Sequence, residues 1–114
     1  NFQNGLSSQS RNIDLHFNPR WIYDSTTKET TKLIVLNSRV NNTWQNESRI
    51  KDFFPFKGGH LTDILFEYKK DEWLIVIDNK YSFTYKHRLS INSIDHISIL
   101  GNVNVKLFQV SNFE

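Results

Sequence analysis

Apolar and polar residues alternate with a period of two along most of the chain, a pattern that predicts β-strands. Short polar segments separate these stretches and predict turns, including tight turns at Lys70-Asp71 and Asp78-Asn79. No segment keeps a 3.6-residue period for three turns, and residues 88–96 would form at most one helical turn. The predicted strands are 1–3, 13–21, 32–40, 47–50, 60–70, 72–79, 80–88, 93–101 and 104–111.

Many short strands joined by turns are typical of an all-β domain built from two packed antiparallel sheets. We therefore predict a two-sheet β-sandwich or jelly roll. The 114 residues contain no internal repeat and no low-complexity tract, and a chain of this length can bury a core of its own. We expect a single domain over residues 1–114.

The composition narrows the classes of function. The chain has no cysteine, which rules out disulfides, thiolate metal sites and cysteine nucleophiles. Its formal net charge is only +2, with the charges interspersed, so no nucleic-acid partner is predicted. No apolar run is long enough to cross a bilayer, and the Asp, Glu and His spacings are not those of a metal site. We therefore expect neither membrane insertion nor a metal or other cofactor.

One predicted strand carries three polar residues that face the same way. Side chains two residues apart share a face of a strand, so His16, Asn18 and Arg20 project together. The apolar residues that alternate with them should face the core. These expected core residues are Ile13, Leu15 and Phe17.

Two further segments carry side chains of a similar kind. The strand 32–40 places Asn37 on one face, and the following segment brings Trp44, then Glu47 and Arg49 on one face. Each residue alone has an ordinary explanation, since an exposed Trp usually packs and a Glu-x-Arg pair is usually weak. Together they combine hydrogen-bonding groups with an indole, which suits a ligand with many hydroxyls and one apolar face. The sequence therefore favours a sugar-binding face.

These residues form a pattern that resembles the galectin carbohydrate-recognition domain. The strings are H-x-N-x-R at 16–20, V-x-N at 35–37 and W-x-x-E-x-R at 44–49, and HFNPR is a hallmark of that family. PFKGG, EWLIVIDNKYSFTYKHR and IDHISILGNVNV are similar to further family segments, so the resemblance covers nearly the whole chain. It implies a concanavalin A-like sandwich that binds β-galactosides, of the lactose or N-acetyllactosamine type, without metal and without catalysis.

The resemblance also implies how the galactose ring would be held. His16, Asn18 and Arg20 would hydrogen-bond the axial 4-hydroxyl, and Arg20 would also reach the ring oxygen. The epimer with an equatorial 4-hydroxyl would leave these groups partly unpaired, at a cost of about 1–3 kcal/mol.

The remaining residues of the pattern would complete the site. Asn37 and Glu47 would hold the 6-hydroxyl, and Trp44 would stack on the apolar face of the sugar. Glu47 and Arg49, together with Arg20, would contact the next sugar, glucose or N-acetylglucosamine. No catalytic residue is expected.

The partners implied by the resemblance are galactose-containing glycans of glycoproteins or glycolipids. Binding should be roughly micromolar to millimolar, because each hydrogen bond exchanged with water yields only about 0.5–1.5 kcal/mol. A homodimer or a second linked carbohydrate-recognition domain would supply multivalency. The family bypasses the secretory pathway, so the expected location is cytoplasmic, extracellular by non-classical secretion, or both. The sequons at Asn41 and Asn46 are then interpreted as chance occurrences.

The chain departs from the family pattern at several places. Gln45 stands where glycine usually follows the tryptophan, Asp78-Asn79 replaces an Asn-Gly turn, and Asn102 replaces the aspartate of G-D-V. One or two strands that normally precede NFQNG are missing, and the sequence has no methionine. We expect these strands to lie in a longer polypeptide or to come from another chain.

Two other classes of function stay open. A glycosidase needs two carboxylates that flank the scissile bond, but arginines favour the charged form of Glu47, and Asp14 is the only other nearby candidate. No Ser/His/Asp order stands out among the four histidines. A protein-interaction module that has lost or altered its sugar specificity is the second alternative, since a fold does not fix a function.

Overall fold

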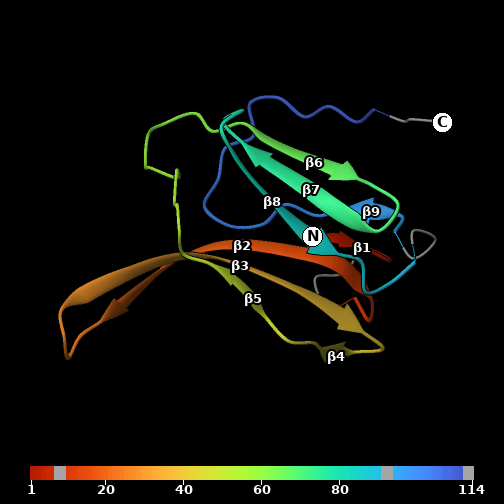
Figure 1. Cartoon of the computed structure of the whole chain (residues 1–114), viewed down its shortest axis with the longest axis horizontal. Coiled ribbons are helices and arrows are strands. Elements are labelled where there is room, and N and C mark those ends of the chain that lie inside the picture. Colours follow the sequence, from red (N-terminus) through yellow and green to blue (C-terminus); the bar gives the residue numbers. More distant parts are fainter. Residues whose placement is uncertain (7–9, 91–93, 112–114) are drawn as a thin grey trace.

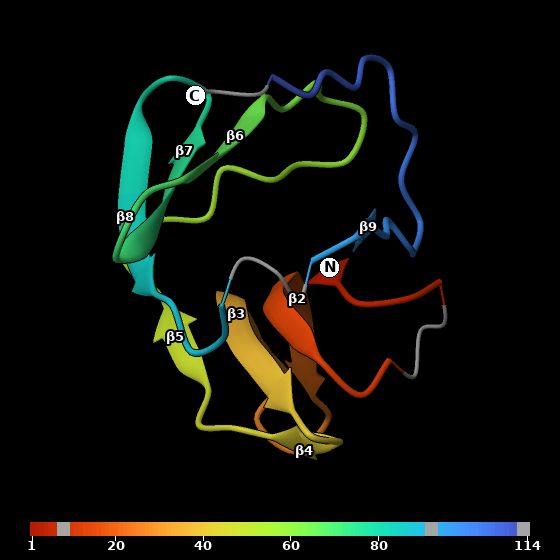
Figure 2. The same cartoon turned by 90° about the vertical axis from the view of Figure 1, so that its right-hand side faces the viewer.

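The computed structural model describes residues 1–6, 10–90 and 94–111, which form two antiparallel sheets packed face to face (Figures 1 and 2). The strands of this part of the chain are β1 (Phe2–Gln3), β2 (Ile13–Asp24), β3 (Glu29–Val40), β4 (Thr43–Trp44), β5 (Ser48–Ile50), β6 (Ile64–Tyr68), β7 (Glu72–Ile77), β8 (Tyr81–Lys86) and β9 (His96–Ile97). The predicted all-β sandwich of two antiparallel sheets is confirmed. No helix among the described residues is long and apolar enough to span a membrane.

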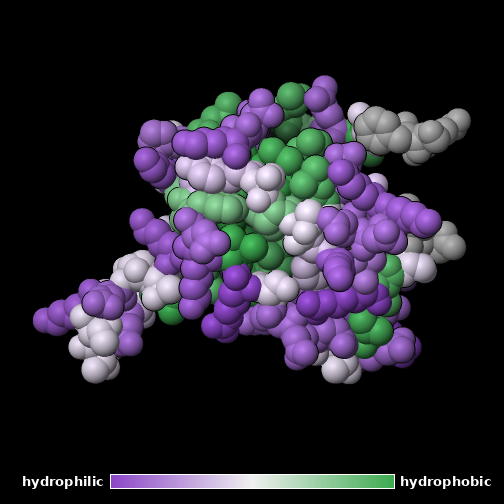
Figure 3. Space-filling view, viewed as in Figure 1, coloured by the Kyte–Doolittle hydropathy of each residue, from purple (hydrophilic) through white to green (hydrophobic). Residues whose placement is uncertain are grey.

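The larger sheet is built around a long hairpin of β2 and β3, each twelve residues in length. Its strands follow the order β4-β3-β2-β1-β9, and β5 pairs with β3 on the same side as β4. The hairpin reaches beyond the other sheet, at the left of Figure 1, and its tip is mostly hydrophilic in Figure 3. The pairing extends from His16 opposite Asn37 to Asp24 opposite Glu29, so most of both strands is in register.

The smaller sheet has the order β6-β7-β8 within the described residues. The hairpin predicted around Lys70-Asp71 joins β6 to β7, and the predicted tight turn joins β7 to β8. Asp78 and Asn79 have φ values of 53° and 54° in that turn, a conformation that these residue types tolerate better than most. Both turns therefore form where the sequence predicted them.

The core lies between the two sheets and is formed by alternate residues of facing strands. Leu15, Ile34 and Leu36 come from the larger sheet and are at most 1% exposed. Trp73, Ile75, Ile77 and Tyr85 come from the smaller sheet, and aromatic residues such as Phe17 and Phe66 pack around them. The interior is thus closed mainly by branched and aromatic side chains, whose burial drives association of the sheets.

The start of β2 departs from the predicted alternation. Its pairing with β3 shifts by one residue between Ile13 and His16, as at a β-bulge. Leu15 and Phe17 face the core as predicted, but Ile13, although buried, is not part of the cluster that contains Leu15. Asp14 is only 2% exposed, so this strand does not present it on the polar face.

The predicted C-terminal strands are largely wrong. Of residues 94–101, the described part of the predicted strand 93–101, only His96–Ile97 is a strand, and the described residues 98–111 form none. Alternation alone does not make a strand, because the backbone must also find a neighbouring edge to pair with. Leu107 and Val110 are accordingly 77% and 71% exposed. Figure 3 shows hydrophobic surface over the upper layer, where this segment and the small sheet lie. The helical turn proposed for 88–96 includes residues 91–93, which lie outside the described residues.

Candidate functional site

The candidate site lies on the face of the larger sheet that points away from the core. The strand register places three pairs directly opposite each other, namely His16 with Asn37, Asn18 with Val35 and Arg20 with Leu33. Both apolar partners are at most 1% exposed. They form an apolar floor between polar side chains. The predicted common face of β2 and β3 is therefore present.

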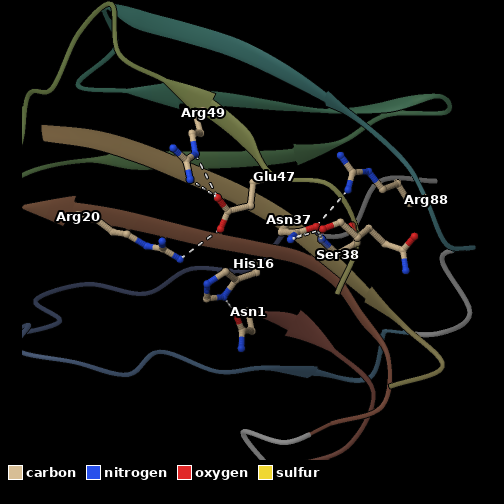
Figure 4. Close-up of polar contacts among 9 residues, drawn as sticks. Asn1, His16, Arg20, Asn37, Ser38, Glu47, Arg49 and Arg88 are labelled. Carbon is tan, nitrogen blue, oxygen red and sulfur yellow. Dashed lines mark hydrogen bonds and ion pairs between the residues drawn. The ribbon is translucent and has the colours of Figure 1, made fainter. Parts of the chain in front are cut away.

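Glu47 lies between two arginines on this face (Figure 4). Its Oε1 accepts hydrogen bonds from Arg49 Nε at 3.1 Å and Nη2 at 2.8 Å. Its Oε2 lies 3.7 Å from Arg20 Nη2. These side chains are partly exposed, so the ion pairs add little to stability, but they fix the carboxylate and both guanidinium groups relative to one another.

Arg20 is held from a second side by Asn18. The amide of Asn18 satisfies its neighbours in the orientation in which its oxygen accepts from Arg20 Nε, at 3.0 Å. The two residues lie two positions apart on β2 and so share a face. Arg20 thus reaches Glu47 with one nitrogen and Asn18 with another, which restricts the rotamers of a long side chain.

Trp44 lies at the edge of the face and is 46% exposed. The turn before it contains Asn41 and Asn42 at positive φ, and both backbone N–H groups donate to residues 11 and 12, at 2.8–2.9 Å. The indole is edge-on to the His16 ring, with centroids 5.1 Å apart, and the guanidinium of Arg39 lies 5.8 Å from it. An indole left accessible beside hydrogen-bonding groups can stack on an apolar face of a ligand.

His16 adds a hydrogen-bond acceptor next to the indole. Its Nδ1 lies 2.7 Å from Asn1 Oδ1, and an amide oxygen only accepts, so Nδ1 donates and Nε2 remains an acceptor. Burial lowers the pKa of His16 below its usual 6.5, the positive charge of Arg20 adds to this, and Glu47 opposes it. The imidazole is therefore neutral near pH 7.

Glu47 has the opposite character and stays ionised. The hydrogen bonds from Arg49 lower the pKa of its carboxyl group, and the positive charges of Arg49 and Arg20 act in the same direction. A carboxylate held in its charged form only accepts hydrogen bonds. It is therefore suited to binding hydroxyls and poorly suited to donating a proton.

Asn37 lies deeper than the other predicted site residues, at 5% exposure. Its Oδ1 accepts from the backbone N–H of Ser38 at 2.7 Å and from Arg88 Nη1 at 3.1 Å, while its Nδ2 donates to the carbonyl of Gln45 at 2.8 Å. Within the described part of the chain, one N–H of the amide is left for a ligand. Asn37 therefore orders the loop after Trp44 in addition to any contact with a ligand.

The sequence interpretation missed Arg88, which lies just after β8 on the smaller sheet. It donates to Asn37 Oδ1 and, at 2.7 Å, to the carbonyl of Asn46, and its guanidinium packs 4.9 Å from the ring of Tyr85. The signal was the arginine that ends YSFTYKHR, a segment already matched to the family. Its contact with β3 depends on the packing of the two sheets, which the sequence does not reveal.

All seven predicted binding residues are thus placed on or beside one face of the larger sheet. Among residues 1–6, 10–90 and 94–111, no three His, Asp or Glu side chains converge as metal ligands would. A fixed carboxylate, arginines, a neutral histidine and an accessible indole on a sheet of a β-sandwich are typical of a lectin domain.

Comparison with known proteins agrees with this class. The family model for the galactoside-binding lectins matches residues 1–110. Galectin-1 of Sus scrofa is 30% identical over 101 residues, which are 89% of this chain and 71% of that protein. Galectin-1 of Ovis aries is 28% identical over 105 residues, covering 92% and 74%, respectively. The chain belongs to the galectin family, whose members are lectins and not enzymes.

The lowered pKa of His16 predicts a specific dependence on pH. The folded state favours the neutral imidazole, so its contribution to stability is present above 6.5 and is lost as pH falls from 6.5 through the lowered pKa. The imidazole signal in an NMR titration should therefore have its midpoint below 6.5. A midpoint at or above 6.5 would contradict the described burial, and His16→Gln should remove this part of the pH dependence of unfolding.

Proposed function

We propose that this chain binds β-galactosides of the lactose or N-acetyllactosamine type on the exposed face of β2–β5, without a metal ion. His16, Asn18 and Arg20 hydrogen-bond the axial 4-hydroxyl of galactose, and Trp44 stacks on its apolar face. The galactose-containing glycans of glycoproteins or glycolipids are the ligands. Lactose and cellobiose differ at the 4-hydroxyl of the terminal ring, so the three polar residues of β2 discriminate between them.

The remaining residues of the site bind the 6-hydroxyl of galactose and the second sugar of the disaccharide. The free N–H of Asn37 and the carboxylate of Glu47 bind the 6-hydroxyl. Glu47, Arg49 and Arg20 contact the next sugar. The observation that best supports this proposal is the Glu47 carboxylate, fixed by Arg49 at 2.8 Å and beside Arg20 at 3.7 Å. Such a group offers acceptors and donors at constant positions, which vicinal hydroxyls can satisfy together.

Two features argue against the enzymatic alternative. Glu47 is held in its charged form and so lacks the proton that a general acid must donate. Asp14, the other carboxylate considered, is 2% exposed and cannot flank a glycosidic bond on this face. The family expectations of multivalency through a homodimer or a linked domain, and of a cytoplasmic or non-classically secreted protein, extend the proposal.

Calorimetric titration with lactose, with cellobiose as a matched ligand, tests the proposed function. We expect lactose to bind at roughly micromolar to millimolar strength and cellobiose to bind at least about tenfold more weakly. Excess EDTA should leave the lactose affinity unchanged. Loss of binding in EDTA that calcium restores would contradict the proposal. No lactose binding by a folded protein would instead favour an interaction module with lost or altered sugar specificity.

Trp44→Ala should abolish detectable lactose binding while leaving the fold intact. The indole is 46% exposed and contributes no atoms to the core cluster, so its loss should not unfold the sandwich. It is, however, the aromatic surface proposed to cover the sugar ring. Calorimetry on the variant, with circular dichroism as the control for folding, measures this. Wild-type affinity in a folded variant would rule out the stacking role.

Glu47→Gln should weaken lactose binding by about ten- to a hundredfold, because the amide loses the charge-assisted bonds and leaves the guanidinium groups less constrained. Arg20→Lys should be similarly costly, since an ammonium cannot reproduce the planar fork that reaches both Asn18 and Glu47. The double variant should lose clearly less than the sum in free energy, because contacting residues couple. Full additivity in calorimetric titrations would mean that the two residues act independently.

A further inference from the structure

Arg88 connects the smaller sheet to the loop that carries the proposed binding residues. It comes from the end of β8, whereas the proposed binding residues lie on strands and loops of the larger sheet. Its Nη1 donates to Asn37 Oδ1 at 3.1 Å (Figure 4) and also to the carbonyl of Asn46 at 2.7 Å. This one nitrogen thus connects the side chain of Asn37 to the backbone of Asn46, the residue that precedes Glu47.

Apart from the side-chain bonds from Gln45 Nε2 to the Thr43 carbonyl and from Arg49 to Glu47, the loop at 45–47 has few other restraints among the described residues. Gln45 N–H donates to the carbonyl of Ser38 at 3.0 Å, and Asn37 Nδ2 donates to the carbonyl of Gln45 at 2.8 Å. Asn37 Oδ1 accepts a hydrogen bond from Arg88 at 3.1 Å in addition to the one from the Ser38 N–H at 2.7 Å, so Arg88 adds to the restraint on the orientation of this amide. Without that contact, the restraint on Gln45 through Asn37 would be weaker as well.

Arg88 packs against Tyr85, a residue that is itself held in place by burial and a hydrogen bond. Its guanidinium lies 4.9 Å from the ring of Tyr85, a buried residue of the core cluster. The Tyr85 hydroxyl lies 2.6 Å from Ser38 Oγ, and Ser38 Oγ also donates to the carbonyl of Asp14 at 2.7 Å. A guanidinium stacked on an aromatic ring and fixed by hydrogen bonds loses little further freedom when the site is used.

We infer that Arg88 is a positioning residue of the sugar-binding site, which fixes the loop 45–47 and thereby presents Glu47 to the ligand. The identity of the ligand in this inference rests on the proposed function. The effect of Arg88 on the order of the loop 45–47 does not depend on that function. Arg88 does not itself contact Glu47. It acts through its hydrogen bonds to Asn37 and to the backbone carbonyl of Asn46. Asn37 in turn donates to the carbonyl of Gln45, the residue that replaces the expected glycine.

Arg88→Met tests the inference, with Lys86→Met as a matched control. Met keeps an unbranched, flexible side chain, shorter than that of arginine, but loses the charge and both donated bonds. Lys86 is an exposed cation at the end of β8, two residues before Arg88, so its variant controls for the loss of one positive charge. Arg88→Lys keeps the charge and one donor but not the fork, and it replaces the Met variant if that variant fails to fold.

The first measurement is hydrogen exchange of the Gln45 amide without sugar. We expect about tenfold faster exchange in Arg88→Met, an intermediate rate in Arg88→Lys and no change in Lys86→Met. Amides of β7 should exchange as in the wild type, which separates local loosening from global destabilisation. An unchanged rate at Gln45 in a folded Arg88→Met variant would overturn the inference, whether or not the protein binds sugar.

The second measurement is lactose affinity by calorimetry. Arg88→Met should bind about tenfold more weakly, and its combination with Glu47→Gln should lose less than the product of the two single effects. An equal loss in Lys86→Met would overturn the inference in favour of a net-charge effect. If the wild type bound no lactose while Gln45 still loosened in Arg88→Met, the proposed function would fail but the positioning role would stand.

Discussion

The pairing of β2 with β3 is the constraint on which both the core and the candidate site depend. Each strand turns one set of alternate side chains toward the smaller sheet and the other set toward the exposed face. Leu15 and Leu36 are thereby buried, while His16 lies opposite Asn37 on the other side. A slip of one residue would exchange the two faces, so burial of the core also specifies the register that assembles the site.

The polar face is ordered before any ligand arrives, although its ion pairs contribute little to stability. Arg20 and Arg49 are directed to Glu47, and Asn18 constrains Arg20 further. Partly exposed pairs of this kind are screened by water. Their value lies elsewhere, because side chains that are already restrained lose less conformational entropy on binding. This order is useful for a ligand whose hydroxyls exchange hydrogen bonds with water at small net gain.

Local patterns predicted most of the fold, and the failures have a common physical cause. The alternation in β2, β3 and β7 and the turn at Asp78-Asn79 are short-range features, and the motif spacing placed His16 and Arg20 on one face. The segment 104–111 alternates as well, but a strand also needs a paired edge, which a periodic pattern cannot supply. The shift at the start of β2 likewise depends on how two strands meet, not on either sequence alone.

The contact between Arg88 and Asn37 is likewise one that local sequence patterns could not predict. It spans 51 positions in the sequence, and it exists only because the smaller sheet packs over the end of β3. The stack on Tyr85, and the bond from Tyr85 to Ser38, tie that arginine to the buried part of the sandwich. The exposed face is therefore not a property of the larger sheet alone. A substitution in the interface between the sheets can move the loop before Glu47 without touching any residue that faces the ligand.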